Sequence, residues 1–137
     1  MCPFALTLGN VTLCNESSLI SWKSKTQTIV ALSTCEAEYV ALATATQEAK
    51  FLRQLLSDLI CFPCKSVCMY VDNQGAIALA NNPIHHQRSK HIDVKYHYVR
   101  LEIQNRVLEL AYIPTDNNVA DVFTKPVTRA KLDRLLD

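Results

Sequence analysis

Glycine is scarce in this sequence: its 137 residues include only two. A Gly-rich loop that cradles phosphate groups is therefore excluded. Long apolar runs are also lacking, since none approaches the roughly 20 residues that a membrane-spanning helix requires. The first residues carry no basic segment followed by a long apolar stretch, so no secretory signal peptide is expected. No local arrangement of Ser, His and an acid suggests nucleophilic catalysis either.

The charge balance is nearly neutral, with a formal net charge of +1 at pH 7. A chain of this charge cannot hold nucleic acid by global attraction, so any such binding must be local. Hydrophobic residues make up 49% of the chain, which excludes a disordered protein, and the length suits one folded domain. We therefore expect a single domain over residues 1–137.

The six cysteines, at positions 2, 14, 35, 61, 64 and 68, are expected to be reduced, because nothing in the sequence directs the chain to an oxidising compartment. A zinc site is the alternative, in which Cys61 and Cys64 would join His86 and His91. The segment between these pairs is long for a zinc finger and contains an apolar strand that would hold them apart. The role of Cys61, Cys64 and Cys68 is left open.

Apolar periodicity and turn residues predict alternating strands and helices. Ser33 and Glu36 have the spacing of a capping box, so a helix is expected to begin at Thr34. No Gly or Pro interrupts the pattern as far as Ile60, which is compatible with one long helix or two. Further strands are expected over 4–8, 11–14, 19–22, 67–71 and 107–113, and further helices over 76–80, 89–104, 118–123 and 129–136. This order predicts an α/β domain, and the apolar run Val67–Val71 indicates a fully buried central strand.

Three carboxylates could carry chemistry. Asp72 directly follows the apolar run, and ligand sites of α/β sheets lie at the carboxyl ends of strands, although a simple turn aspartate fits the pattern too. Glu38 is favoured over Glu36, because Glu36 serves the helix cap whereas Glu38 shares the face expected to meet the sheet. Asp121 lies in a short predicted helix, where it could instead complement the helix dipole. Carboxylates from three separate elements are what a hard divalent cation requires.

Several motifs follow one another along the chain in a specific order and spacing. They are Ile20-Ser21-Trp22-Lys23-Ser24-Lys25, Ser33-Thr34-x-Glu36-Ala37-Glu38-Tyr39, Asp72-Asn73-Gln74-x-Ala76-Ile77, Arg88-Ser89-Lys90-His91-Ile92-Asp93, Tyr112-Ile113-Pro114-Thr115, Ala120-Asp121 and Thr124-Lys125-Pro126. Together they resemble the ribonuclease H domain of copia-type retrotransposon Pol polyproteins, over about residues 19–137.

The resemblance implies a ribonuclease H-like fold, a five-stranded mixed β-sheet flanked by α-helices. It also implies two Mg²⁺ ions, with Mn²⁺ as a possible substitute, which hydrolyse the RNA strand of RNA–DNA hybrids. The family's preference for RNA would rest on contacts to the 2′-hydroxyl. Residue by residue, the catalytic and metal-binding carboxylates fall on Glu38, Asp72 and Asp121, and contacts to nucleic acid are assigned to Asn73, Lys90 and His91.

The resemblance further implies the partners and the location of the chain. The partners are an RNA–DNA hybrid and the reverse transcriptase portion of the same polyprotein, with no membrane. The location is inside the cell, either in the cytoplasm, where the family forms virus-like particles, or in the nucleus.

The sequence departs from the family at one point, because the family also uses an aspartate on its first, central strand. The only acidic residue before Glu36 is Glu16, which lies in a turn-like segment. We therefore expect this strand to be missing, residues 4–8 to form the second strand, and residues 1–18 to be a diverged segment of an N-terminally truncated copy. Residues 4–8 could instead fill the gap in the sheet, but they bring no carboxylate. Hydrolysis by the chain is then expected to be poor or absent. The alternative is a non-catalytic nucleic-acid-binding or interaction module that retains the fold.

Basic residues and all four histidines gather between residues 85 and 106. The basic residues are Arg88, Lys90, Lys95, Arg100 and Arg106. They could follow a phosphate backbone with salt-dependent affinity, or they could form a solvated helix face among interleaved acidic residues. The sequence leaves both interpretations open.

Overall fold

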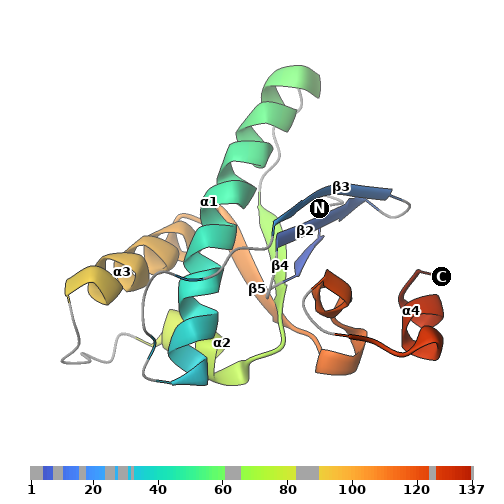
Figure 1. Cartoon of the computed structure of the whole chain (residues 1–137). Coiled ribbons are helices and arrows are strands. Elements are labelled where there is room, and N and C mark those ends of the chain that lie inside the picture. Colours follow the sequence, from blue (N-terminus) through green and yellow to red (C-terminus); the bar gives the residue numbers. More distant parts are fainter. Residues whose placement is uncertain are drawn as a thin grey trace.

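The computed structural model describes residues 5–7, 11–15, 18–23, 27, 31, 33–60, 66–82, 90–123 and 126–136. Its elements are, in order, β1 (Ala5–Thr7), β2 (Val11–Asn15), β3 (Ser18–Lys23), α1 (Thr34–Ile60), β4 (Val67–Val71), α2 (Gln74–Asn81), α3 (Lys90–Gln104), β5 (Leu108–Tyr112), the 3-10 turns η1 (Thr115–Asn117) and η2 (Val119–Phe123), and α4 (Arg129–Leu136). Figure 1 shows α1 running along the sheet with α2 and α3 beside it, and α4 on the opposite side of the view from α3. The order of strands and helices agrees with the prediction except at 118–123, where a helix was expected and the 3-10 turn η2 is observed.

The five strands form one mixed sheet in the order β3-β2-β1-β4-β5. The three N-terminal strands make an antiparallel meander, in which Leu6 pairs with Leu13 and Thr12 pairs with Trp22. β4 pairs in parallel with β1 on one side and with β5 on the other. Because neighbouring parallel strands need a crossover connection, α2 and α3 lie between β4 and β5 in the chain.

A strand does occupy the centre of the sheet, so the expectation that it is missing is wrong, and the alternative in which residues 4–8 fill the gap is confirmed. β1 lies between β2 and β4, and β2 rather than residues 4–8 takes the second position. The physical reason is that unpaired edges on β2 and β4 would leave backbone groups without partners, and the short β1 pairs with both. The difference from the family lies in composition, because Ala5-Leu6-Thr7 contains no carboxylate.

α1 is a single helix of 27 residues rather than two helices. The hydroxyl of Ser33 accepts a hydrogen bond from the backbone N–H of Glu36 at 3.2 Å, which confirms the predicted cap. Small side chains on the inner face bring α1 close to its neighbours, and Ala45 and Ala49 are buried. α1 packs against both α2 and α3.

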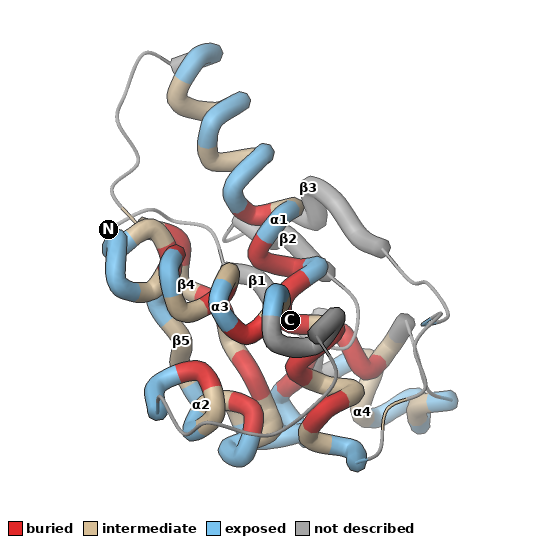
Figure 2. Tube along the Cα trace, turned by 90° about the vertical axis from the view of Figure 1, so that its left-hand side faces the viewer, coloured by how far each residue is buried: buried red, intermediate tan, exposed pale blue. Residues whose placement is uncertain are grey.

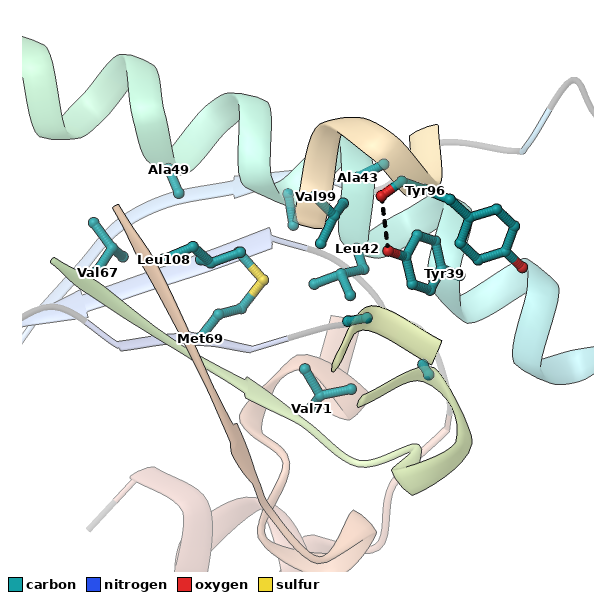
Figure 3. Packing of buried hydrophobic residues seen from close by; sticks show 13 residues of the cluster. Tyr39, Leu42, Ala43, Ala49, Val67, Met69, Val71, Tyr96, Val99 and Leu108 are labelled. Carbon is teal, nitrogen blue, oxygen red and sulfur yellow. Dashed lines mark hydrogen bonds between the residues drawn. The ribbon is translucent and has the colours of Figure 1, made fainter. Parts of the chain in front are cut away.

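The core lies between this helical layer and the sheet, where buried segments of α1, α3 and β4 face one another (Figures 2 and 3). Leu42 of α1 and Met69 of β4 are both 0% exposed. Tyr39 stacks at a tilt on Tyr96 of α3, with 4.1 Å between ring centroids, and donates its hydroxyl to the carbonyl of Tyr96 at 3.4 Å. Burial raises the pKa of Tyr39.

The burial of β4 alternates along the strand, although its sequence is apolar throughout. Val67, Met69 and Val71 are buried, whereas Cys68 and Tyr70 are half-buried. The strand at 67–71 is therefore confirmed, but the expectation of burial on both faces is wrong, because the helices α1 to α3 cover the face of Met69. Burial and the nearby Glu109 raise the pKa of the Cys68 thiol, which keeps it protonated and unreactive at neutral pH.

An ion pair fastens α3 to α1. Lys50 Nζ lies 2.5 Å from Oε1 of Glu102, whose side chain is 3% exposed, while that of Lys50 is 52% exposed. Lys50 also lies 5.9 Å from the centroid of the Tyr98 ring. The hydrogen bond to Glu102 raises the pKa of Lys50. A buried carboxylate requires a partner of this kind, so the pair holds the two helices in register.

Candidate active site

Asp72 lies at the carboxyl end of β4, where the sequence predicted a site. The backbone N–H of Ile113 donates to the carbonyl of Val71 at 3.0 Å, so the pairing of β4 with β5 continues up to this point. Asn73 then caps α2, because its side-chain oxygen accepts from the backbone N–H of Ala76 at 3.1 Å. A half-buried carboxylate at the end of a parallel strand, just before a helix, stands where ligands of α/β sheets bind.

Glu38 is brought to the same end of the sheet by the close approach of α1 to α2. A Cβ placed on Gly75 would lie 3.1 Å from Sγ of Cys35 and 3.1 Å from Oδ1 of Asn73. The first turn of α1 thus lies against the first turn of α2, and a side chain at position 75 would press on it. Glu38 is three residues after Cys35 and shares its side of the helix. It is half-buried, whereas Glu36 is 0% exposed.

Asp121 lies on η2, in a segment folded by the side chain of Asn118. The amide oxygen of Asn118 accepts from the backbone N–H of Ala120 at 3.1 Å, and its carbonyl accepts from the N–H of Asp121 at 3.1 Å. The Asp121 side chain is 7% exposed, and its Oδ2 lies 3.3 Å from Nζ of Lys131. The carboxylate is therefore buried against the ammonium group of α4.

The three predicted carboxylates come from three elements, since Glu38 lies on α1, Asp72 follows β4 and Asp121 lies on η2, which contacts β2. Their convergence on one cation stays a prediction. In the described part of the chain, no three His, Cys, Asp or Glu side chains lie close enough together to hold a metal ion.

The family resemblance implies two Mg²⁺ ions, which require several oxygen ligands from the site. Glu38 and Asp72 offer the oxygen ligands that Mg²⁺ prefers. Asp121, however, is in contact with Lys131, and β1 supplies no carboxylate. The donor set therefore does not fit a two-ion centre. The residues of the zinc alternative, Cys61, Cys64 and His86, lie outside the described residues, as does the side chain of His91.

The basic residues between positions 85 and 106 have different structural roles. Arg100 donates through Nη2 to the carbonyl of Leu79 at 3.0 Å and to that of Asn82 at 2.6 Å, so it satisfies the C-terminal carbonyls of α2. Lys90 begins α3, but its side chain, like the whole of Arg88, lies outside the described residues. The structure thus gives Arg100 a role that neither interpretation of the sequence included.

Arg106 ends α3 in the left-handed backbone region, with φ of 56°. Its N–H donates to the carbonyl of Ile103 at 3.0 Å, and the N–H of Val107 donates to that of Glu102 at 3.0 Å. These two hydrogen bonds are those of a Schellman motif, in which glycine is the usual residue at this position. The backbone conformation thus places Arg106 at the end of α3, a role separate from any contact of its side chain with phosphate.

The residues that sequence reasoning missed are Lys131 and the Lys50–Glu102 pair. Lys131 is 10 residues from Asp121, and Lys50 is 52 residues from Glu102. Helical periodicity relates positions three or four residues apart, so it carries no signal for either contact. A prediction that Glu102 lies on the buried side of α3 would have indicated that its carboxylate needs a charged partner.

The sequence was compared with known proteins. No family model matches the chain. It is similar to the Retrovirus-related Pol polyprotein from transposon TNT 1-94 of Nicotiana tabacum, with 43% identity over 114 residues, which is 83% of this chain and 8% of that polyprotein. The corresponding polyprotein from transposon RE1 of Arabidopsis thaliana is 38% identical over 110 residues, 80% of this chain and 8% of its own length. The Transposon Ty1-DR5 Gag-Pol polyprotein of Saccharomyces cerevisiae is 29% identical over 88% of this chain and 7% of its own length.

The chain thus spans less than a tenth of the length of these curated relatives. Among solved structures, the fold is similar to that of RNase H1 from the halophilic archaeon Halobacterium salinarum, with a TM-score of 0.58. The match covers 84% of this chain and 88% of that one at 13% identity, so it concerns the fold alone.

Within the described residues, every helix is too short or too polar to cross a membrane.

Proposed function

The chain belongs to the ribonuclease H-like regions of copia-type retrotransposon Pol polyproteins, and from this premise we propose that it is the module which cleaves the RNA strand of RNA–DNA hybrids in its parent polyprotein. One observation carries the proposal. The first turn of α1, with Cys35, lies against the start of α2, which directly follows Asp72 and Asn73 at the end of β4. This contact supports the proposal that Glu38, three residues after Cys35, and Asp72 act together at the edge of the sheet where α/β proteins bind their ligands.

The chain as it stands is proposed to hydrolyse hybrids poorly or not at all. The family resemblance implies a further aspartate on the central strand, and β1 has none. Asp121 is bonded to Lys131 instead of standing open to a cation. Bound Mg²⁺ would supply Lewis acidity at the scissile phosphate, and this chain holds too few suitably placed carboxylates for two such ions.

We propose that the chain still binds RNA–DNA hybrids although it cleaves them poorly. The residues assigned to it are Asn73, whose oxygen caps α2 at the end of β4, and Lys90 and His91 at the start of α3. The reverse transcriptase portion of the polyprotein is the proposed partner, since it would deliver the hybrid on which this module acts.

The test is a gel assay of an end-labelled RNA strand in an RNA–DNA hybrid, with Mg²⁺ or Mn²⁺. The wild type is expected to leave the RNA intact while retarding the hybrid more than duplex DNA. Asp72→Asn is the site variant, and Asp58→Asn, at an exposed carboxylate bonded to Gln54, is its control. Efficient cleavage by the wild type that is lost only in Asp72→Asn would overturn the proposed impairment, and absence of hybrid binding would overturn the proposed recognition.

A second candidate is a non-catalytic binding or interaction module that has kept the fold. The observation in its favour is the contact between Asp121 and Lys131, which neutralises a carboxylate that catalysis would need. Calorimetric titration with Mg²⁺ separates the two candidates. Heat from binding of Mg²⁺ supports the impaired nuclease, whereas no heat at all supports the module.

A further inference from the structure

Lys131 places its ammonium group among oxygen atoms of the two 3-10 turns that follow β5. Its Nζ lies 3.3 Å from Oδ2 of Asp121, 3.4 Å from the carbonyl oxygen of Thr115 and 3.8 Å from Oδ1 of Asp116. The Asp121 side chain is 7% exposed and that of Lys131 is 19% exposed, whereas that of Asp116 is 83% exposed. The contact with Asp121 is therefore largely removed from water, and the one with Asp116 lies at its rim.

α4 brings Lys131 to this place. The backbone N–H of Lys131 donates to the hydroxyl of Thr128 at 3.4 Å, and the N–H of Leu132 donates to the carbonyl of Thr128 at 3.0 Å, so the helix begins just before Lys131. Lys131 is the third residue of the helix and points back to the turns from its first turn. Figure 1 shows α4 close to the segment that follows β5.

We infer that Lys131 is the resident counter-charge of Asp121, and that it competes with any divalent cation for this carboxylate. A buried carboxylate requires either a cation or hydrogen-bond donors, and the ammonium of Lys131 supplies both. A divalent cation on Asp121 would lie within a few ångströms of the ammonium, where like charges repel strongly. Cation binding at Asp121 therefore requires that Lys131, and with it the start of α4, moves away. The choice of a divalent cation rests on the proposed function, whereas the tests below measure cation binding and thermal stability and not nuclease activity.

The first test measures Mn²⁺ binding by electron paramagnetic resonance. Lys131→Gln is expected to raise the affinity for Mn²⁺ about tenfold, within the usual range for coupling between sites. Arg129→Gln is the matched control, because it removes the same charge from the same helix but only breaks an exposed pair with Asp133. We expect it to change the affinity less than twofold. In Lys131→Gln/Asp121→Asn the gain should disappear.

The second test measures thermal unfolding in the presence of a chelator and after addition of Mg²⁺. Lys131→Gln removes the ammonium group from beside the buried carboxylate of Asp121, so the melting temperature of the variant should fall by about 3–6 °C in the chelator. Mg²⁺ should restore the lost stability, and it should have no such effect in Lys131→Gln/Asp121→Asn. Lys131→Arg, which keeps the charge, should behave as the wild type does.

Two results would overturn the inference. One is an Mn²⁺ affinity of Lys131→Gln equal to that of the wild type, and the other is a gain that persists when Asp121 is replaced. If Lys131→Gln does not fold in the chelator, Mg²⁺ should restore its helical circular dichroism, and a chain that stays unfolded in saturating Mg²⁺ also overturns the inference. Failure of hybrid binding or of cleavage would overturn the proposed function and leave these readouts unchanged.

Discussion

Replacement of Lys50 by methionine is expected to destabilise the fold far more than loss of an exposed ion pair does. In the wild type, Nζ of Lys50 lies 2.5 Å from Oε1 of Glu102, whose side chain is 3% exposed. Methionine keeps most of the aliphatic stem but removes the ammonium group. The carboxylate of Glu102 then stays buried between α1 and α3 without a counter-charge.

The expected loss follows from the burial of the two partners. Removal of one member of a fully buried ion pair costs about 3–5 kcal/mol. Because the Lys50 side chain is 52% exposed, water screens part of its charge, and we reduce the estimate to about 2 kcal/mol. The side chains of Arg129 and Asp133 in α4 are 87% and 57% exposed, so Arg129→Gln should cost at most about 0.5 kcal/mol.

Urea denaturation followed by circular dichroism measures both values. A double-mutant cycle of Lys50→Met and Glu102→Gln should give a coupling energy of about 1–2 kcal/mol, because the double variant no longer buries a lone charge. The reasoning is refuted if Lys50→Met is no less stable than Arg129→Gln. It is also refuted if the coupling energy does not differ from zero.

Three further substitutions test local features of the fold. Arg106→Gly should stabilise the protein by about 1 kcal/mol in urea denaturation, because glycine adopts the left-handed conformation at the end of α3 without strain, and a loss of stability would contradict this. Burial raises the pKa of Tyr39, so above about pH 10 the unfolded chain loses a proton that the folded state keeps, and stability falls by about 1.4 kcal/mol per pH unit. Tyr39→Phe should remove this part of the alkaline slope in urea titrations, and an unchanged slope would show that the phenol is accessible. Gly75→Ala should be harmful in the wild type and less harmful in a Cys35→Ala background, since removal of the sulfur atom relieves one of the two close contacts of the new methyl group and leaves the one with Oδ1 of Asn73. Equal effects of Gly75→Ala in both backgrounds, measured by thermal unfolding, would disprove the crowding.

The elements of this fold were largely predictable because each depends on neighbours in the sequence. The cap at Ser33, the strand Val67–Val71 and the helix Arg129–Leu136 were expected and are observed. Their signals are apolar periodicity and capping residues, which act over three or four positions. The positions of Asp72 after β4 and of Glu38 in the first turns of α1 followed from the same rules.

Features that join distant segments could not be derived in this way. The place of β1 between β2 and β4, the bond from Lys131 to Asp121 and the carbonyl contacts of Arg100 depend on how the elements pack. The energy of each contact comes from burial, and burial exists only once the helices cover the sheet. Local chemistry therefore determined which helices and strands form and which carboxylates could serve a site, whereas packing decided that Asp121 faces an ammonium group.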